Sequence, residues 1–368
     1  MIIEEISLIN FRNYKNLNIS FSPNINIIYG NNGEGKTNLL EAIYVLGLSK
    51  SYKTPFTSYL INNNCSFSHI KGIIKTDNIR SILEITIDSN KKILKIDKNN
   101  IFKIADYINK LNLIIFSPED LELIKGSPSE RRKYFDVQIS QIKLKYFKLL
   151  NEYNKILKQR NEILKSKKID KNYFNIITES LIKRGIEIYK YRNNYIENIN
   201  RNINNIFYNI TDLKGFKIKY NPLINININN ELKLIEKYKE EIEKNYENEL
   251  KIGSTLVGPH RDDFDFFIET KNLKNYGSQG QQRSGILALK LSEIPIFKKY
   301  NKTFPVLLLD DVFSELDDSK KNNILKYISK DIQIFITTTD LKSINQNIIK
   351  QANIIKIKKG NLVYEREV

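Results

Sequence analysis

Residues 30–37 constrain this chain more than any other part of its sequence. They read Gly-Asn-Asn-Gly-Glu-Gly-Lys-Thr and match the pattern G-x-x-x-x-G-K-S/T at every fixed position. Glycines let main-chain N–H groups turn inward toward a phosphate, and a helix that follows directs the positive end of its dipole at the same anion. Lys36 would place a charge on the terminal phosphates and Thr37 a hydroxyl on Mg²⁺. The run therefore predicts a phosphate-binding loop, or P-loop.

The residues on either side of the loop fit this prediction. Ile25 to Tyr29 is a short apolar run, which predicts a strand that ends where the loop begins. Residues 39–48 are apolar enough to predict a buried helix directly after it. We therefore expect ATP and Mg²⁺ as ligands. The residues expected to bind the nucleotide are Gly30, Asn31, Asn32, Gly33, Glu34, Gly35, Lys36 and Thr37.

A second candidate feature is a pair of carboxylates after an apolar run. Residues 304–309 are wholly apolar, which predicts a central strand buried on both faces, and Asp310 and Asp311 follow it directly. Ligands of open parallel sheets bind at the carboxyl ends of the strands. Asp310 is therefore expected to hold Mg²⁺ together with Thr37, and Asp311 to orient or deprotonate the attacking water. Lys36, Asp310 and Asp311 are the candidate catalytic residues. A pair of solvated acids in a turn is the alternative.

A third feature is the polar segment 277–282, which precedes an apolar helical run at 286–294. Ser278 can cap this helix, and the cluster of serine, glycine and glutamine again offers main-chain N–H groups at a helix N-terminus. Taken alone, the segment is equally compatible with an ordinary structural cap.

Strand-like segments occur at both ends of the chain, whereas the middle is helical. Residues 2–29 and 67–116 contain apolar and alternating runs, and the strand pattern returns after residue 253. In between, one helix carries a seam with heptad spacing, which Arg160 interrupts; its positions are Tyr146, Leu149, Tyr153, Ile156, Arg160 and Ile163. A second helix is expected from Tyr173 to Asn209, a linker over 221–230 and a charged helix over 231–251. We expect a head domain formed by residues 1–125 and 250–368, with a helical arm formed by residues 126–249.

The composition of the chain gives only a moderate indication of the class of molecule that it binds. The formal net charge is +17 at pH 7, which favours a polyanionic partner, although lysine is inflated in a chain so rich in Ile, Asn and Lys. The single cysteine, Cys65, suits a reducing compartment, and no apolar stretch is long enough to predict a membrane span. These observations indicate a cytoplasmic protein that does not associate with membranes.

The order of the three features resembles that of the ABC-type ATPases. Residues 30–37 correspond to their Walker A motif, 277–282 to their signature and 306–311 to their Walker B motif, while 314–317 is similar to their D-loop. The resemblance implies a dimer in which each signature contacts the nucleotide bound by the other subunit. It therefore adds four residues to the expected nucleotide site, namely Ser278, Gly280, Gln281 and Asp317.

Further segments narrow the resemblance to the RecF family of bacterial recombination mediators. They are residues 8–14, 116–121, 126–136, 258–263, 277–283 and 309–317. The resemblance implies an ABC-type α/β head with a mixed sheet, and an inserted helical arm with a short coiled coil. It implies ATP-dependent dimerisation, binding to duplex DNA and to single-strand/double-strand junctions, and slow DNA-stimulated hydrolysis that resets the dimer. It implies RecR as a partner, with RecO and RecA downstream at gapped DNA, and it places Arg12 near the phosphates.

Three positions depart from the usual ABC-type pattern. Asp311 replaces a glutamate, residues 117–120 stand where relatives carry a glutamine, and Thr337 to Asp340 replaces a histidine. His260 is expected to be structural, since no cluster of Cys or His surrounds it, and Arg261, Asp262 and Asp263 form either an internal ion-pair network or part of a dimer seam. A transporter ATPase would have a shorter gap between P-loop and signature, and a full-length SMC protein would have far longer coiled coils. Both alternatives are disfavoured.

Overall fold

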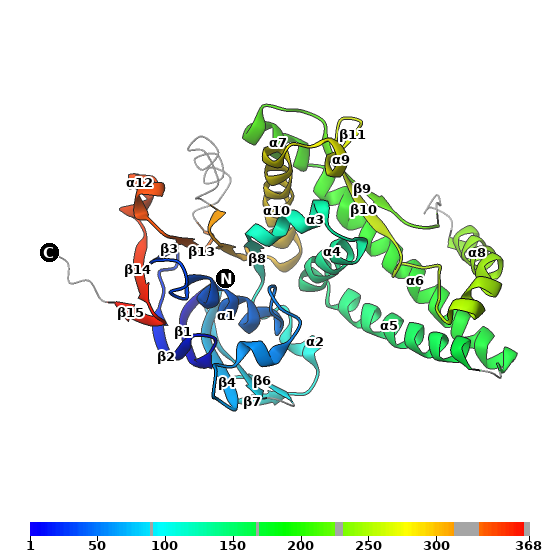
Figure 1. Ribbon diagram of the computed structural model, residues 1–368, viewed down its shortest axis with the longest axis horizontal. Coiled ribbons are helices and arrows are strands. Elements are labelled where there is room, and N and C mark those ends of the chain that lie inside the picture. Colours follow the sequence, from blue (N-terminus) through cyan, green and yellow to red (C-terminus); the bar gives the residue numbers. More distant parts are fainter. Residues whose placement is uncertain (89–90, 167–168, 225–230, 313–330, 364–368) are drawn as a thin grey trace. The chain divides into compact units, whose positions relative to one another are not determined.

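The computed structural model describes the chain except for residues 89–90, 167–168, 225–230, 313–330 and 364–368 (Figure 1). The chain divides into two compact units, one formed by residues 1–120 and 290–368 and the other by residues 121–289. The first unit is therefore assembled from both ends of the sequence, as the strand patterns predicted.

One sheet of the first unit is antiparallel, with the strand order β2-β1-β4-β5-β6-β7. Its side chains alternate between buried and half-buried or exposed positions, as expected for a sheet with one face toward the core. Its strands are β1 Ile2–Phe11, β2 Tyr14–Ser20, β4 Phe67–Thr76, β5 Ile79–Asp88, β6 Lys92–Ile96 and β7 Asn99–Ile101.

The second sheet of this unit has the order β15-β14-β3-β13-β12-β8, and β14, β3, β13, β12 and β8 run parallel. Strands β12 and β13 are fully buried. The strands are β3 Ile25–Tyr29, β8 Leu113–Phe116, β12 Val306–Leu309, β13 Ile334–Thr338, β14 Asn353–Lys358 and β15 Asn361–Val363. The two sheets together are the mixed α/β head predicted from the sequence, and the fold class is confirmed.

Helix α1 (Lys36–Leu48) forms the centre of the first unit's core. Its aliphatic residues are buried, and most of them belong to one core cluster with Ile3 and Leu8 of β1 and Leu308 of β12. The shorter elements of this unit are η1 Thr57–Leu60, α2 Ile104–Tyr107, η2 Pro118–Leu121, η4 Leu341–Ser343 and α12 Gln346–Ile349.

The second unit is mainly helical. Figure 1 shows its long helices α5 and α6 running side by side, and the sheet β11-β10-β9 completes it. Its elements are α3 Glu122–Lys125, α4 Pro128–Ile142, α5 Leu144–Lys165, α6 Lys171–Asn200, α7 Ile203–Thr211, β9 Phe216–Asn221, α8 Glu231–Ile252, β10 Asp263–Ile268, β11 Lys271–Asn272 and α9 Leu273–Tyr276. Helix α10 (Gln279–Asn301) begins in this unit and ends in the first.

The division between the units differs from the predicted one. The sequence placed the arm at residues 126–249, whereas the second unit extends over residues 121–289. The reason is the sheet: β10 pairs with β9, and Asp263 of β10 accepts two hydrogen bonds from Arg131 of α4, at 2.6 and 2.9 Å. Residues 263–272 therefore belong to the arm, and so does the signature segment 277–282.

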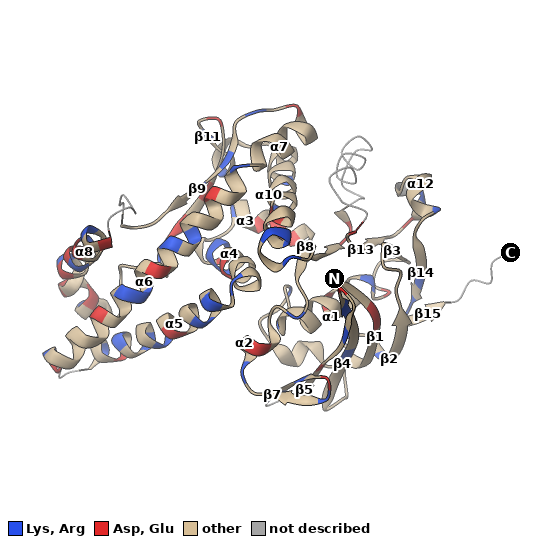
Figure 2. Ribbon diagram, turned by 180° about the vertical axis from the view of Figure 1, so that it is seen from behind, with Lys and Arg blue, Asp and Glu red and all other residues tan. Residues whose placement is uncertain are grey.

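The helical seam of the arm is largely as predicted. Tyr146, Leu149 and Tyr153 are buried, whereas Ile156 and Ile163 are only half-buried. The helix expected from Tyr173 to Asn209 is instead two helices, because the side-chain amide of Asn200 both donates to and accepts from the main chain of Ile218 in β9. In the helices of this unit, basic and acidic residues are interspersed, as Figure 2 shows along α6.

Candidate functional site

The predicted P-loop connects β3 to α1 in the first unit. The ammonium of Lys36 donates hydrogen bonds to the loop's own carbonyl oxygens, those of Gly30 at 2.7 Å and Asn31 at 2.9 Å. Lys36 is almost fully buried, and this burial lowers the pKa of its ammonium, while the nearby carboxylates of Asp311, Asp310 and Glu34 act against the shift. The loop thus wraps around a cation held at its centre.

Two glycines of the loop are required by its backbone. Gly30 has φ of 153° and Gly35 has φ of 116°, which lie in the region that favours glycine. A Cβ on Gly30 would lie 2.3 Å from the carbonyl oxygen of Ile357, and one on Gly35 would lie 2.6 Å from Asn13 Nδ2. The loop therefore fits the close approach of main-chain N–H groups to phosphate that its sequence predicted.

Two turns from distant parts of the sequence hold the loop from outside. The carbonyl oxygen of Glu34 accepts from Asn13 Nδ2 at 3.0 Å and from the main-chain N–H of Gly360 at 2.9 Å. The next carbonyl, that of Gly35, accepts from the hydroxyl of Tyr14 at 2.8 Å. No sequence motif marked these supports, which come from the β1–β2 turn and the β14–β15 turn.

Asp310 lies beside the P-loop although 273 positions separate it from Thr37. It follows β12, and only β13 stands between β12 and β3 in the sheet, so the carboxyl ends of these strands meet at one edge. Thr37 and Thr337 each donate to its Oδ1 at 2.9 Å, and Tyr52 donates to its Oδ2 at 3.1 Å. Burial raises the pKa of Asp310, and the hydrogen bonds from its donors oppose this shift.

Asp311, the second predicted acid, is half-buried and has φ of 54°. Its main-chain N–H donates to the hydroxyl of Thr337 at 2.9 Å. Thr337, the first residue of the unusual switch segment, therefore connects the two acids: it donates to Asp310 and accepts from Asp311. The predicted D-loop residue Asp317 lies outside the described residues.

Arg12, which the resemblance placed near the phosphates, forms an ion pair with a carboxylate of α1. Its Nε and Nη2 donate to Glu41 Oε2 and Oε1 at 2.8 and 2.7 Å, and Glu41 is fully buried. Such a bidentate pair orients the guanidinium plane. The ion pair fixes Arg12 to the helix that starts with Lys36 and Thr37.

The predicted signature segment belongs to the second unit. Ser278 Oγ accepts from the main-chain N–H of Gln281 at 3.2 Å, while Gln281 Oε1 accepts from the N–H of Ser278 at 3.0 Å. This reciprocal capping of α10 confirms the predicted role of Ser278 as a helix cap. Ser278 and Gly280 are exposed, and a Cβ on Gly280 would meet only the Ser278 hydroxyl oxygen, at 4.0 Å.

Residues 117–120 form the turn after β8, where other ABC-type ATPases carry a glutamine. In this turn Asp120 makes an ion pair with Lys290. Lys290 Nζ lies 2.6 Å from Asp120 Oδ1, and the main-chain N–H of Ser117 donates to Asp120 Oδ2 at 2.6 Å. Lys290 is buried, so Asp120 is held inward, whereas Glu119 in the same turn is exposed.

His260 and its neighbours form a network within the second unit. The two ring nitrogens of His260 lie 2.7 Å from the Tyr153 hydroxyl and 3.0 Å from the carbonyl oxygen of Thr255, and burial lowers the pKa of the ring to about 4. Asp262 pairs with buried Arg192 at 3.3 Å, and Asp263 pairs with Arg131. These contacts confirm a structural histidine and favour the internal ion-pair network. The described residues contain no cluster of His, Cys, Asp and Glu suited to a metal ion.

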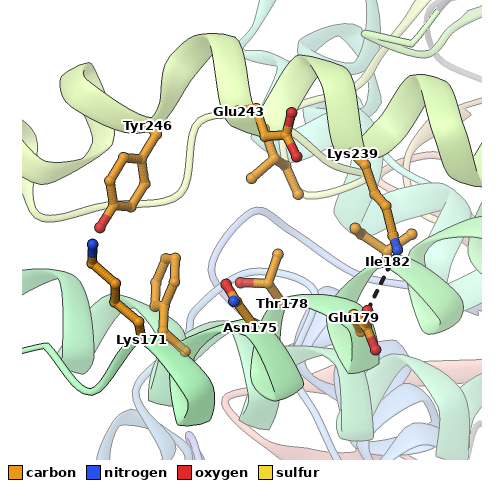
Figure 3. Close-up of a pocket in the computed structure, with 10 residues that line it drawn as sticks. Lys171, Asn175, Thr178, Glu179, Ile182, Lys239, Glu243 and Tyr246 are labelled. Atoms are coloured by element: carbon orange, nitrogen blue, oxygen red, sulfur yellow. Dashed lines mark hydrogen bonds and ion pairs between the residues drawn. The ribbon is translucent and has the colours of Figure 1, made fainter.

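A cavity of about 570 Å³ lies between α6 and α8 in the second unit (Figure 3). Phe174, Ile182 and Ile242 are its buried apolar residues, and an ion pair between Lys239 and Glu179, 3.4 Å long, spans it. None of the sequence-predicted site residues lines it. The candidate site is therefore the P-loop and the edge of the sheet beside it.

Comparisons with known proteins agree with this geometry. The family described as RecF/RecN/SMC N terminal domain matches residues 2–361. The DNA replication and repair protein RecF of Bacillus cytotoxicus is 39% identical over 366 residues, covering 98% of each chain. A solved structure of the recombination mediator protein RecF with ATP in the RecFOR pathway is 35% identical, with a TM-score of 0.91 over 99% of this chain and 97% of that one.

An SMC head bound to a domain of ScpA is similar in fold alone, at 18% identity and a TM-score of 0.57 over 99% of this chain and 97% of that one. Among the helices in the described part of the chain, none combines the length and apolarity needed to cross a bilayer. Full-length identity, the family match and the fold agree with one another: the chain belongs to the RecF family of ABC-type ATPases.

Proposed function

We propose that residues 30–37 bind ATP, and that Asp310 and Asp311 serve its hydrolysis. The observation that carries this proposal is the 2.9 Å hydrogen bond between Thr37 and Asp310, which joins the P-loop to the acidic end of a buried strand. A similar protein, RecF, has been solved with ATP, which supports the choice of nucleotide. Lys36 would neutralise phosphate charge, and Asp311 would orient or deprotonate the attacking water.

The residues around Asp310 fit Mg²⁺. This ion prefers oxygen ligands and is often bound through one or two carboxylates, and Thr37 and Asp310 bring a hydroxyl and a carboxylate together. When bound, Mg²⁺ would neutralise charge on the phosphate oxygens. Thr37 and Asp310 would hold it, directly or through water.

We further propose that two copies of the chain share each nucleotide. Ser278, Gly280 and Gln281 would contact ATP held by the partner's P-loop, and Asp317 would contribute from the same interface. The exposure of Ser278 and Gly280, and the helix N-terminus that Ser278 caps, support this role because both suit an anion. Arg12, held by its ion pair with Glu41, would lie near the phosphates of the same nucleotide.

The closed dimer would bind DNA in the cytoplasm. The formal charge of +17 supports contacts to the phosphate backbone, with affinity that falls steeply as salt rises. Relatives named as replication and repair proteins, and a structure assigned to the RecFOR pathway, support a role in recombination at gaps. RecR would be the direct partner, with RecO and RecA acting downstream, and slow DNA-stimulated hydrolysis would reset the dimer.

Lys36→Ala tests the link between nucleotide and DNA. The variant should lose ATP binding, because it removes the ammonium that the carbonyl oxygens of Gly30 and Asn31 hold within the loop, and stable DNA binding should be lost with it. Filter binding of duplex and gapped DNA, with and without saturating ATP and at two salt concentrations, measures both effects. DNA affinity equal to that of the wild type in the presence of ATP would refute the coupling.

Ser278→Arg tests the shared site separately. It should leave ATP binding intact but block dimerisation, because a long cationic side chain would replace the small cap at the proposed interface. Size-exclusion chromatography with and without ATP reports the outcome. A normal ATP-dependent dimer of this variant would count against the shared site.

A further inference from the structure

Tyr52 reaches the candidate site although no motif predicted it. It follows α1, in a turn whose shape is fixed by Ser51: the hydroxyl oxygen of Ser51 accepts from the N–H groups of Lys53 and Thr54, and its hydrogen is donated to buried Glu41. The ring of Tyr52 packs edge to face on Tyr44, with centroids 5.2 Å apart. Both its main chain and its ring are therefore held in place.

The hydroxyl of Tyr52 limits what Asp310 can offer to a ligand. A carboxylate has about four lone-pair sites, two on each oxygen. Thr37 and Thr337 take both sites on Oδ1, and Tyr52 takes one on Oδ2. With only the described residues counted, one acceptor direction on Oδ2 is left, and the Tyr52 hydrogen bond helps to determine where it points.

We propose that Tyr52 is a positioning residue, which orients Asp310 Oδ2 toward Mg²⁺ or a water bound to it. This inference rests on the proposed ATP site. Groups that hydrogen-bond to a metal-binding carboxylate orient it, and their loss typically weakens metal affinity by about 10- to 100-fold. Tyr52 acts through Asp310 Oδ2, at the end of the site proposed to bind the metal.

Tyr52→Phe is the test, with Tyr44→Phe as its matched control. The first variant keeps the ring and deletes the hydroxyl that Asp310 accepts, whereas the second deletes a hydroxyl in the same aromatic pair. The affinity for a fluorescent ATP analogue is titrated in EDTA and against rising Mg²⁺, and Mn²⁺ bound with nucleotide is counted by electron paramagnetic resonance. Thermal melting checks that each variant is folded.

Tyr52→Phe should need about tenfold more Mg²⁺ or Mn²⁺ for half-saturation while binding the analogue normally in EDTA, and Tyr44→Phe should match the wild type. Three results would overturn the inference: an unchanged metal requirement, an equal loss of affinity in EDTA, or a wild-type affinity that does not depend on Mg²⁺. A wild-type protein that bound no nucleotide would instead remove the proposed function.

Discussion

The buried ion pair of the arm offers a prediction whose size can be worked out from the structure. Arg160 of α5 and Glu249 of α8 are both fully buried, and Arg160 Nη2 lies 2.7 Å from Glu249 Oε2. Arg160 also donates to Thr178 at 3.0 Å and to Thr255 at 2.8 Å, and its guanidinium lies 4.7 Å from the ring centre of Phe174. Arg160 thus has partners on several sides, of which one carries the opposite charge.

Glu249→Gln removes that charge and keeps the shape of the side chain. The buried guanidinium is then uncompensated, and breaking a buried pair in this way costs about 3–5 kcal/mol of unfolding free energy. Replacing both residues with apolar ones of similar size, Arg160→Met with Glu249→Leu, should recover part of this loss, because neither charge then has to be desolvated. The recovery is partial because the main-chain N–H of Leu256 loses its acceptor, Glu249 Oε1, at 2.8 Å. Glu152→Gln is the control: its 3.0 Å pair with Arg184 joins α5 to α6 at the surface and should contribute less than about 1 kcal/mol.

Urea unfolding measures these differences, followed by circular dichroism and tyrosine fluorescence, since the chain has 21 tyrosines and no tryptophan. Because the chain forms two units, hydrogen exchange of peptides from α5 and α8 assigns the loss to the arm. A loss below about 1 kcal/mol for Glu249→Gln, or a double variant that is less stable than the single one, would refute the reasoning.

Two further predictions concern a turn and a titrating group. Gly360→Ala should weaken binding of a fluorescent ATP analogue, because φ of 74° and a Cβ 2.5 Å from the Asn13 carbonyl oxygen would move the turn that holds Glu34; an affinity equal to that of the wild type would contradict this. His260 has its pKa lowered from 6.5 to about 4, so between these values the unfolded chain binds a proton that the folded chain does not, and stability should rise as pH rises through that window. His260→Gln should flatten this rise in urea titrations at several pH values. Asp262, whose pKa is raised to about 6 by burial, titrates in both the wild type and the variant, so its effect on stability cancels when the two are compared. Identical slopes of stability against pH in the two proteins would contradict the role given to His260.

Local patterns in the sequence were sufficient for the parts of the site that depend on local structure. The glycines, Lys36 and Thr37 lie within eight positions, and their strand and helix follow from apolar runs on either side. Asp310 could be predicted for the same reason, because a strand buried on both faces shows as an uninterrupted apolar run and the residue after it lies at the edge of the sheet.

Contacts made between distant segments were not predictable in this way. The order of the strands and the conformations of the turns bring Tyr52, Tyr14 and Gly360 to the site. Strand order and turn conformation leave no periodic signal in a single sequence. The helical seam gives a second example of a contact that the sequence did not predict. Its pattern marked Arg160 as irregular, but the identity of its partner, Glu249, depends on how α8 packs in the folded arm.

The order of strands also explains how an arm can interrupt this site without altering it. Residues 121–289 are inserted between β8 and β12, yet the two strands are adjacent and parallel, with Val306 opposite Leu113 and Leu309 opposite Phe116. The entropy lost on closing a loop grows only with the logarithm of its length, by about 0.6 kcal/mol for each doubling, so a long insertion adds little to the cost of pairing its ends. The position of Asp310 beside Thr37 is therefore set by the pairing of β12 with β8 and β13, and changes within the arm that preserve its two ends should leave that hydrogen bond in place.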